Sequence, residues 1–292
     1  MENIQGKAAF IEIVKTFEGD MGPIGIFDSG YGGLTVFRDI VRKLPQYDYV
    51  YLGDNARVPY GTRSFETVYA YTKECVEKLF AMDCHLVVLA CNTASAKALR
   101  TIQQRDLPEQ PELRKVLGVI RPTTEVIGYH TKTRHIGILA TPGTVKSMSY
   151  PIEIQKFFPD ISVHQQACPL WVPLVENGEL DSPGTAYFVE REIGRLLGQS
   201  PDIDTVVLAC THYPLLYPLI RRFLPDHIHL LSQGELVADS LAAYLLRHPE
   251  VEELCSKRGH TSFFTTDNAV DFEKRAETFY GKPIKATSMS PR

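Results

Sequence analysis

The amino-acid sequence predicts an α/β fold made of two pseudo-symmetric α/β domains, with largely parallel sheets and an active site in the cleft between them. Two observations lead to this prediction. Short β-branched runs alternate with longer helical runs along the chain, which is the pattern of consecutive βαβ units. The second half of the chain also repeats a five-residue run of the first half, because residues 206–210 (VVLAC) are identical to residues 87–91.

The individual elements follow from hydrophobic periodicity. In the first half, we predict strands over residues 24–27, 49–52 and 86–90, and helices over 34–44, 64–82 and 94–104. In the second half, strands are predicted over residues 136–139, 163–167 and 205–209, each followed by a helical stretch. Residues 24–26 (IGI) also align with 136–138, and the residues three positions on, Ser29 and Thr141, match in type. We therefore expect a duplicated α/β half.

We expect three parts along the chain. Residues 1–22 are predicted to be an N-terminal arm, in which 8–15 can form a short amphipathic helix. Residues 23–118 together with 230–292 are predicted to form the first α/β domain, and 119–229 the second. Ligands bind at the carboxyl ends of the strands in sheets of this class, so two facing halves are expected to enclose one site.

Composition excludes several classes of function. The 292 residues are 44% hydrophobic, which suffices for a full core, and 31 basic against 35 acidic residues give a net charge of −4. Without a block of Lys and Arg, no nucleic-acid partner is expected. No apolar run approaches the roughly 18 residues of a membrane span, and Glu2, Glu12 and Glu18 interrupt the N-terminus where an export signal would lie. A cytoplasmic protein is therefore predicted.

The six cysteines form no C-x-x-C pair of the kind used for zinc or redox chemistry. We expect reduced thiols, and we interpret Cys75, Cys84 and Cys255 as small buried apolar residues. Cys91 and Cys210 differ because each comes directly after a predicted strand and directly before a helix. A helix N-terminus lowers the pKa of a thiol and attracts carboxylates.

Two cysteines in equivalent places of two facing halves suit a reaction that needs one acid–base group on each face of an atom. In a racemisation, one thiolate removes a proton from a carbon atom and the opposing thiol delivers a proton to the other face. The alternative is that Cys91 and Cys210 are inert core residues at strand ends, and their symmetry favours function over that alternative.

Other polar residues follow predicted strands. Asp28, Ser29 and the glycines of residues 30–33 allow close backbone approach, but their spacing is that of neither a P-loop nor a G-x-G-x-x-G motif. The loop over residues 53–61 is either part of a site or a solvent-facing turn. His212 could exchange a proton with a nearby thiol and Asp28 could assist on the other side, although a structural donor and a helix cap are the commoner roles of such residues.

Four ordered blocks resemble the signature of bacterial glutamate racemases. They are residues 25–35 (GIFDSGYGGLT), 59–61 (PYG), 90–95 (ACNTAS) and 207–214 (VLACTHYP). The resemblance extends over residues 23–290 and leaves out the N-terminal arm. It implies an isomerase of the aspartate/glutamate racemase superfamily that needs neither pyridoxal phosphate nor a metal and supplies D-glutamate for peptidoglycan and the cell wall.

The resemblance also implies roles for individual residues. Cys91 would take the proton from D-glutamate and Cys210 from L-glutamate. Asp28 and His212 would assist these bases, and Glu176 matches a further acidic residue near the second cysteine. The carboxylates and amine of the substrate would be held by Asp28, Ser29, Tyr60, Gly61, Asn92, Thr93, Thr211 and His212.

Three alternatives stay open. The first is a racemase of aspartate or a related acid, although the blocks at 59–61 and 211–213 favour glutamate. The second is a thiol hydrolase with a Cys210/His212 pair, which leaves Cys91 without a role and has no clear third residue. The third is a non-catalytic amino-acid-binding protein with two lobes. The sequence allows a homodimer and does not specify the oligomeric arrangement.

Overall fold

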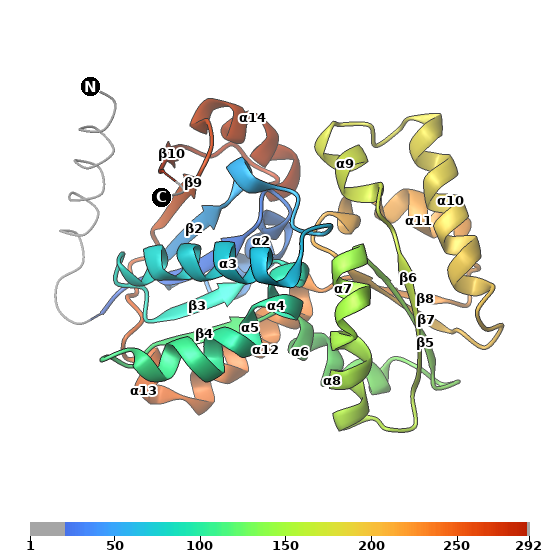
Figure 1. Ribbon diagram of the computed structural model, residues 1–292, viewed down its shortest axis with the longest axis horizontal. Coiled ribbons are helices and arrows are strands. Elements are labelled where there is room, and N and C mark those ends of the chain that lie inside the picture. Colours follow the sequence, from blue (N-terminus) through green and yellow to red (C-terminus); the bar gives the residue numbers. More distant parts are fainter. Residues whose placement is uncertain (1–20, 291–292) are drawn as a thin grey trace.

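The structure is a computed structural model and describes residues 21–290. Its strands form two separate sheets, one of six strands and one of four, and every pair of neighbouring strands is parallel. Each sheet lies in its own body, with helices packed around it (Figure 1). The predicted two-domain α/β fold with parallel sheets is confirmed.

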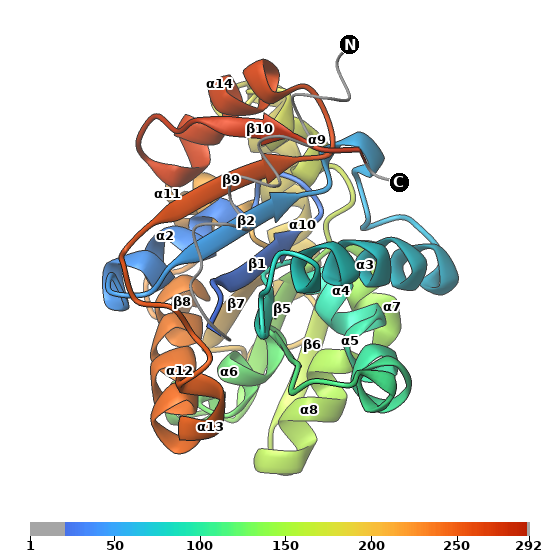
Figure 2. The ribbon, with the colours of Figure 1, turned by 90° about the vertical axis from the view of Figure 1, so that its left-hand side faces the viewer.

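The first sheet has the strand order β10-β9-β2-β1-β3-β4, and Figure 2 shows its strands β10, β9, β2 and β1 side by side. The strands are β1 (Ile24–Asp28), β2 (Tyr49–Gly53), β3 (Leu86–Leu89), β4 (Lys115–Gly118), β9 (Thr261–Thr265) and β10 (Ala286–Ser288). The helices of this domain are α2 (Gly33–Lys43), α3 (Phe65–Phe80), α4 (Asn92–Lys97), α5 (Leu99–Thr101), α12 (Gly234–Arg247), α13 (Pro249–Glu252) and α14 (Ala269–Tyr280).

The second sheet has the order β6-β5-β7-β8. Its strands are β5 (His135–Ala140), β6 (Ser162–Ala167), β7 (Thr205–Ala209) and β8 (His229–Leu231). The helices are α6 (Ile120–Thr124), α7 (Pro142–Ser147), α8 (Ser149–Phe157), α9 (Trp171–Glu176), α10 (Pro183–Leu197) and α11 (Tyr217–Phe223). This order repeats β2-β1-β3-β4 of the first sheet. The registers also agree, because Ile26 pairs with Val88 on β3 and Ile138 pairs with Val207 on β7.

Several elements depart from the prediction. Strands β4, β8, β9 and β10 were not predicted, since β4 is half-buried at an edge, β8 and β10 have three residues each, and β9 (TSFFT) begins with polar residues. The helix predicted over 94–104 is interrupted at Ala98, where φ is −111°. The helix predicted over 8–15 lies outside the described residues, and of the predicted arm Gly22 forms a bridge to Cys255.

The domain boundaries can be placed against the sheets. The expected boundary at 118/119 directly follows β4, the last strand of the first sheet before the crossing. The expected return at 229/230 falls inside β8, and β8 pairs with β7 of the second sheet. We therefore propose that the second domain extends to Leu231.

An aromatic cluster stabilises the first domain. Phe37 on α2 is fully buried. Its ring contacts four others with centroid distances of 5.4–5.9 Å, those of Tyr49, Tyr51, Phe263 and Tyr280. These residues lie on β2, β9 and α14, so Phe37 joins the N-terminal and C-terminal segments of this domain. Among residues 21–290, no helix has the length and apolar character that crossing a bilayer requires.

We expect Phe37→Ala to lower the free energy of unfolding by about 3–5 kcal/mol, because the substitution leaves a cavity between α2 and the sheet. Urea denaturation followed by circular dichroism measures the change. Leu246→Ala is the control, since Leu246 is 86% exposed and its loss should change stability by less than about 0.5 kcal/mol. Equal effects of the two substitutions would contradict the assignment of Phe37 to the core.

Candidate active site

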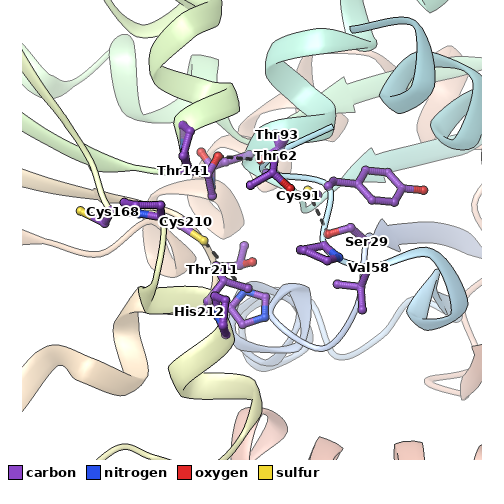
Figure 3. Close-up of a pocket in the computed structure, with 18 residues that line it drawn as sticks. Ser29, Val58, Thr62, Cys91, Thr93, Thr141, Cys168, Cys210, Thr211 and His212 are labelled. Carbon is purple, nitrogen blue, oxygen red and sulfur yellow. Dashed lines mark hydrogen bonds between the residues drawn. The ribbon is translucent and has the colours of Figure 1, made fainter. Parts of the chain in front are cut away.

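One pocket lies between the two domains, at the carboxyl ends of their central strands (Figure 3). It brings together nine of the predicted site residues, Ser29, Tyr60, Gly61, Cys91, Asn92, Thr93, Cys210, Thr211 and His212. Asp28 and Glu176 are not part of the lining. They lie directly behind it, because Asp28 precedes Ser29 and Glu176 bonds to His212.

Cys91 lies between the end of β3 and the start of α4. Its Sγ accepts a hydrogen bond from the backbone N–H of Ala94 at 3.4 Å and donates to Ser29 Oγ at 3.4 Å. Burial and the negative charge of Asp28 raise the pKa of Cys91 to about 12, against the opposing effect of these two hydrogen bonds. The helix N-terminus lowers this pKa through the Ala94 N–H, in the expected direction, but loss of hydration outweighs that effect and the net pKa of Cys91 is raised.

Asp28 is the last residue of β1 and is completely buried. Its Oδ2 accepts the N–H of Gly30 at 2.9 Å, and its Oδ1 has no hydrogen-bond partner within residues 21–290. Burial raises the pKa of Asp28, while the positive charge of His212 lowers it. Asp28 therefore offers a buried carboxylate oxygen with spare hydrogen-bonding capacity beside the first cysteine.

Cys210 follows β7 in the place that Cys91 occupies after β3, and it has a different partner. Its Sγ lies 3.9 Å from His212 Nδ1, and His212 Nε2 lies 2.9 Å from Glu176 Oε1. Burial alone would lower the pKa of His212, but the hydrogen bonds to Cys210 and Glu176 outweigh burial and raise the pKa to about 10. His212 is therefore protonated at neutral pH.

The two sulfurs face each other across the pocket (Figure 3). The charge of Cys210 contributes to the raised pKa of Cys91, so the two thiols interact electrostatically. Each thiol has its own polar partners, Ser29 and Asp28 on one side and His212 and Glu176 on the other. The site can therefore hold a proton on one side while it accepts a proton on the other.

The predicted binding hydroxyls lie where the two domains meet. Thr93 Oγ1 is 2.9 Å from Thr141 Oγ1 across the pocket. Thr211 contributes its side chain to the lining, while its backbone carbonyl accepts a hydrogen bond from Thr35 Oγ1 at 2.9 Å. The carbonyl of Gly61 accepts the N–H of Gly143, also from the other domain, at 2.8 Å.

Two predicted binding side chains are engaged elsewhere. The Tyr60 hydroxyl donates to Asp54 Oδ2 at 2.5 Å, and Asp54 is not among the residues that line the pocket. The Asn92 amide donates to Gln233 Oε1 and accepts from the Tyr150 hydroxyl, both at 2.7 Å. Tyr60 can therefore present its ring and backbone to a ligand, and Asn92 its backbone.

The sequence reasoning missed several residues that shape the site. Thr141 and Cys168 line the pocket, and the alignment of Thr141 with Ser29 in the internal repeat could have identified the threonine. Gln233 bonds to Asn92, Tyr150 and the crossing segment between the domains, and no sequence signal indicated it. In the described part of the chain, no three His, Cys, Asp or Glu side chains are placed to hold a metal ion.

Residues 24–239 match the profile of the family described as Asp/Glu/Hydantoin racemase. The chain belongs to this racemase family. The glutamate racemase of Persephonella marina is 40% identical over 262 residues, which cover 89% of this chain and 94% of that protein. The expected resemblance to glutamate racemases is confirmed, and the chain is an isomerase.

Solved structures of the family have the same fold. A glutamate racemase isoform of Bacillus anthracis superposes with a TM-score of 0.84 at 34% identity, covering 93% of this chain and 98% of that chain. The Francisella tularensis glutamate racemase in complex with D-glutamate gives a TM-score of 0.82 at 28% identity, covering 94% and 99%. The similarity therefore includes both domains.

The approach of the two domains at the pocket depends on Gly32. A Cβ atom there would lie 2.3 Å from Thr211 Oγ1 and 2.4 Å from His212 Nδ1. We expect Gly32→Ala to displace His212 and to lower kcat/KM at least about tenfold, the order of one disturbed catalytic hydrogen bond. Steady-state assays measure this loss.

The control for Gly32→Ala is Gly194→Ala on α10, where no atom lies within 4 Å of the new Cβ. This control should keep wild-type activity and gain about 0.5–1 kcal/mol of stability. A Gly32→Ala enzyme with wild-type kcat/KM would contradict the close approach.

A second prediction concerns pH. The pKa of His212 rises from 6.5 to about 10 on folding, so the stabilisation from its proton is fully present below pH 6.5 and is lost as the pH rises through 10. The free energy of unfolding of the wild type should therefore fall, relative to that of His212→Asn, over this window. Urea titrations at a series of pH values test this, with His227→Asn at an exposed histidine as control. If the stability advantage of the wild type over His212→Asn stays constant or grows with pH, the pKa of His212 is not raised.

Proposed function

We propose that this glutamate racemase interconverts L- and D-glutamate with Cys91 and Cys210 as its two bases, without pyridoxal phosphate or a metal. The observation that carries the proposal is that two thiols lie on opposite sides of one pocket, at equivalent strand ends of two similar domains. A planar carbanion between them can be protonated from either face, which is what racemisation requires.

From L-glutamate, the Cys210 thiolate takes the α-proton and the electron pair stays on the α-carbon. The Cys91 thiol then gives its proton to the opposite face. The product is D-glutamate, with a thiol at Cys210 and a thiolate at Cys91. The reverse reaction restores the first state, and so does proton exchange with solvent.

The surroundings of the two sulfurs suit this direction of proton transfer. The raised pKa of Cys91 keeps that sulfur protonated as the acid. On the other side, His212 Nδ1 lies 3.9 Å from Cys210 Sγ, within hydrogen-bonding distance of that sulfur. Glu176 keeps His212 oriented toward the sulfur through the bond to Nε2.

Polar groups around the pocket match an amino acid with two carboxylates. The hydroxyls of Ser29, Thr93 and Thr211 can donate hydrogen bonds to carboxylate oxygens. Asp28 lies directly behind the lining, and its Oδ1 has no hydrogen-bond partner within residues 21–290, so its negative charge can attract the substrate ammonium. A bound ammonium would also offset the negative charge that opposes ionisation of Cys91.

A thiol hydrolase is the competing reaction, because the row Cys210, His212 and Glu176 has the order of a nucleophile, a base and an orienting carboxylate. It leaves Cys91 on the opposite wall without a function. Family membership also weighs against a hydrolase. We therefore interpret His212 and Glu176 as residues that assist proton transfer at Cys210.

We expect the product D-glutamate to supply peptidoglycan synthesis, and we expect the protein to act in the bacterial cytoplasm. This location and the absence of a nucleic-acid partner stay predictions, and so does a homodimer. Aspartate is the alternative substrate to be tested beside glutamate.

Replacing either cysteine by serine should lower kcat/KM for racemisation by about 10²–10⁴, the usual contribution of one acid–base group. L- and D-glutamate have equal free energies, so kcat/KM falls by the same factor in both directions. The two variants should therefore be distinguished by kcat and by the primary isotope effect with each 2-deuterated enantiomer. The assay is circular dichroism of dialysed enzyme with L- or D-glutamate, and L-aspartate as a comparison.

Cys168→Ser is the matched control, because this thiol also lines the pocket but donates its hydrogen bond to the carbonyl of Gln166, at 3.7 Å. It should lower activity less than about threefold, well below the loss of an acid–base group. In heavy water, the wild type should introduce deuterium into the product before the remaining substrate. Full activity of Cys91→Ser, or identical behaviour of both serine variants with both enantiomers, would rule out the two-base assignment.

A further inference from the structure

We propose that helix α14 of the first domain positions the acid–base partner of Cys210 in the second domain, through Arg275 and Phe279. The proposal rests on the role of His212 and Glu176 in the proposed function. Arg275 and Phe279 touch neither the two sulfurs nor the pocket, so they are positioning residues.

The contact that carries this proposal is a hydrogen bond between the domains. Arg275 Nη1 donates to the backbone carbonyl of Glu176 at 2.9 Å. Glu176 is the last residue of α9, and the last carbonyls of a helix have no partner within the helix. The same residue bonds to His212 Nε2 at 2.9 Å through its side chain. Two hydrogen bonds in series therefore connect α14 to the histidine beside Cys210.

The ring of His212 is held by the same helix. The Phe279 ring meets it edge-on, with a centroid distance of 5.5 Å and an interplanar angle of 81°. Tyr31 stacks on Phe279 at 5.7 Å, and the Arg275 guanidinium lies 5.9 Å from the Tyr31 ring centroid. Arg275 thus holds the carboxylate partner of His212, while Phe279 limits the movement of its ring.

These contacts cross between the domains. Helix α14 packs against α2, β9 and β10 of the first domain, and α9 packs against α10 of the second. Figure 1 shows α14 opposite α9, where the two bodies meet. A change in the angle between the domains would therefore alter the position of Glu176 through its hydrogen bond to Arg275. Among the hydrogen bonds of the described residues, Cys91 has no comparable contact with α14. The contacts of Arg275 and Phe279 therefore act on proton transfer at Cys210 and not at Cys91.

Arg275 can be replaced without damage to the core, because its side chain is exposed. We expect Arg275→Ala to lower kcat about tenfold with KM within about twofold, since the carboxylate loses its alignment while the pocket lining stays intact. Arg275→Lys keeps a cation and should recover part of the loss. Lys274→Ala is the matched control and should keep wild-type kcat, because the ion pair that Lys274 forms within residues 21–290 is with Asp271 of the same helix, at 3.6 Å. All three variants should unfold at the wild-type urea midpoint.

The pH profile separates positioning from a simple effect of charge. The charged groups around His212 are Cys210, Glu176 on α9 and Asp28 at the end of β1, with Arg275 approaching from α14. If Arg275 acted only through its positive charge, its removal would raise the pKa of His212 and move the alkaline limb of kcat to higher pH. Loss of the Glu176 hydrogen bond lowers the pKa of His212 and moves the limb to lower pH. If the alkaline limb of the kcat profile of Arg275→Ala lies at lower pH than that of the wild type, the positioning role is supported. If the limb is unchanged or lies at higher pH, the positioning role is overturned.

A double-mutant cycle with Glu176→Ala completes the test. If Arg275 acts through Glu176, then Arg275→Ala should add less than about twofold to the loss of kcat caused by Glu176→Ala. Additive losses would overturn the proposal. If Glu176→Ala keeps wild-type kcat, the assisting role of Glu176 is wrong and the positioning role fails with it, while the two cysteines remain the bases. If Glu176→Ala is impaired and Arg275→Ala is not, only the positioning role fails.

Discussion

The site depends on the close approach of two domains at Gly32. Each parallel sheet delivers one cysteine to the end of a central strand, but a single sheet cannot place two sulfurs on opposite sides of one carbon atom. The glycine allows the loop after β1 to contact Thr211 and His212 of the other domain, at distances that a side chain would prevent. The hydrogen bond from Thr35 Oγ1 to the Thr211 carbonyl fixes the two loops at the same place.

Burial of charge is the second constraint on this site. Asp28, Cys91 and His212 are all withdrawn from water, so each depends on its neighbours for its charge state. Asp28 and loss of hydration favour a neutral Cys91, whereas Glu176 and Cys210 favour a charged His212. In a medium of low dielectric constant these effects are strong. The surroundings therefore favour a neutral thiol at Cys91 and a positive charge at His212.

The two domains share a backbone and differ in chemistry. The strand orders β2-β1-β3-β4 and β6-β5-β7-β8 coincide, and so do the registers that place Cys91 and Cys210. The partners of the sulfurs come from unrelated positions, since Ser29 follows β1 while Glu176 lies at the end of α9. This asymmetry agrees with a reaction in which one group must be an acid when the other is a base.

The sequence determined the two-domain α/β fold and the position of both cysteines, because these depend on local patterns. Hydrophobic runs specify strands, and the repeated VVLAC run specifies equivalent strand ends. The ordered blocks also indicated the residues around the pocket. Sequence patterns were insufficient for β4, β8, β9 and β10, which are short or only partly apolar.

Only the tertiary structure decided which atoms of those residues meet. The Tyr60 hydroxyl and the Asn92 amide bond to Asp54 and Gln233, so these polar groups are engaged within the protein, whereas the motifs had indicated them as substrate-binding groups. The raised pKa of Cys91 also required the structure, because burial is a property of the whole fold and not of a helix N-terminus. Hydrogen bonds and desolvation depend on residues far apart in the chain, and no local pattern records them.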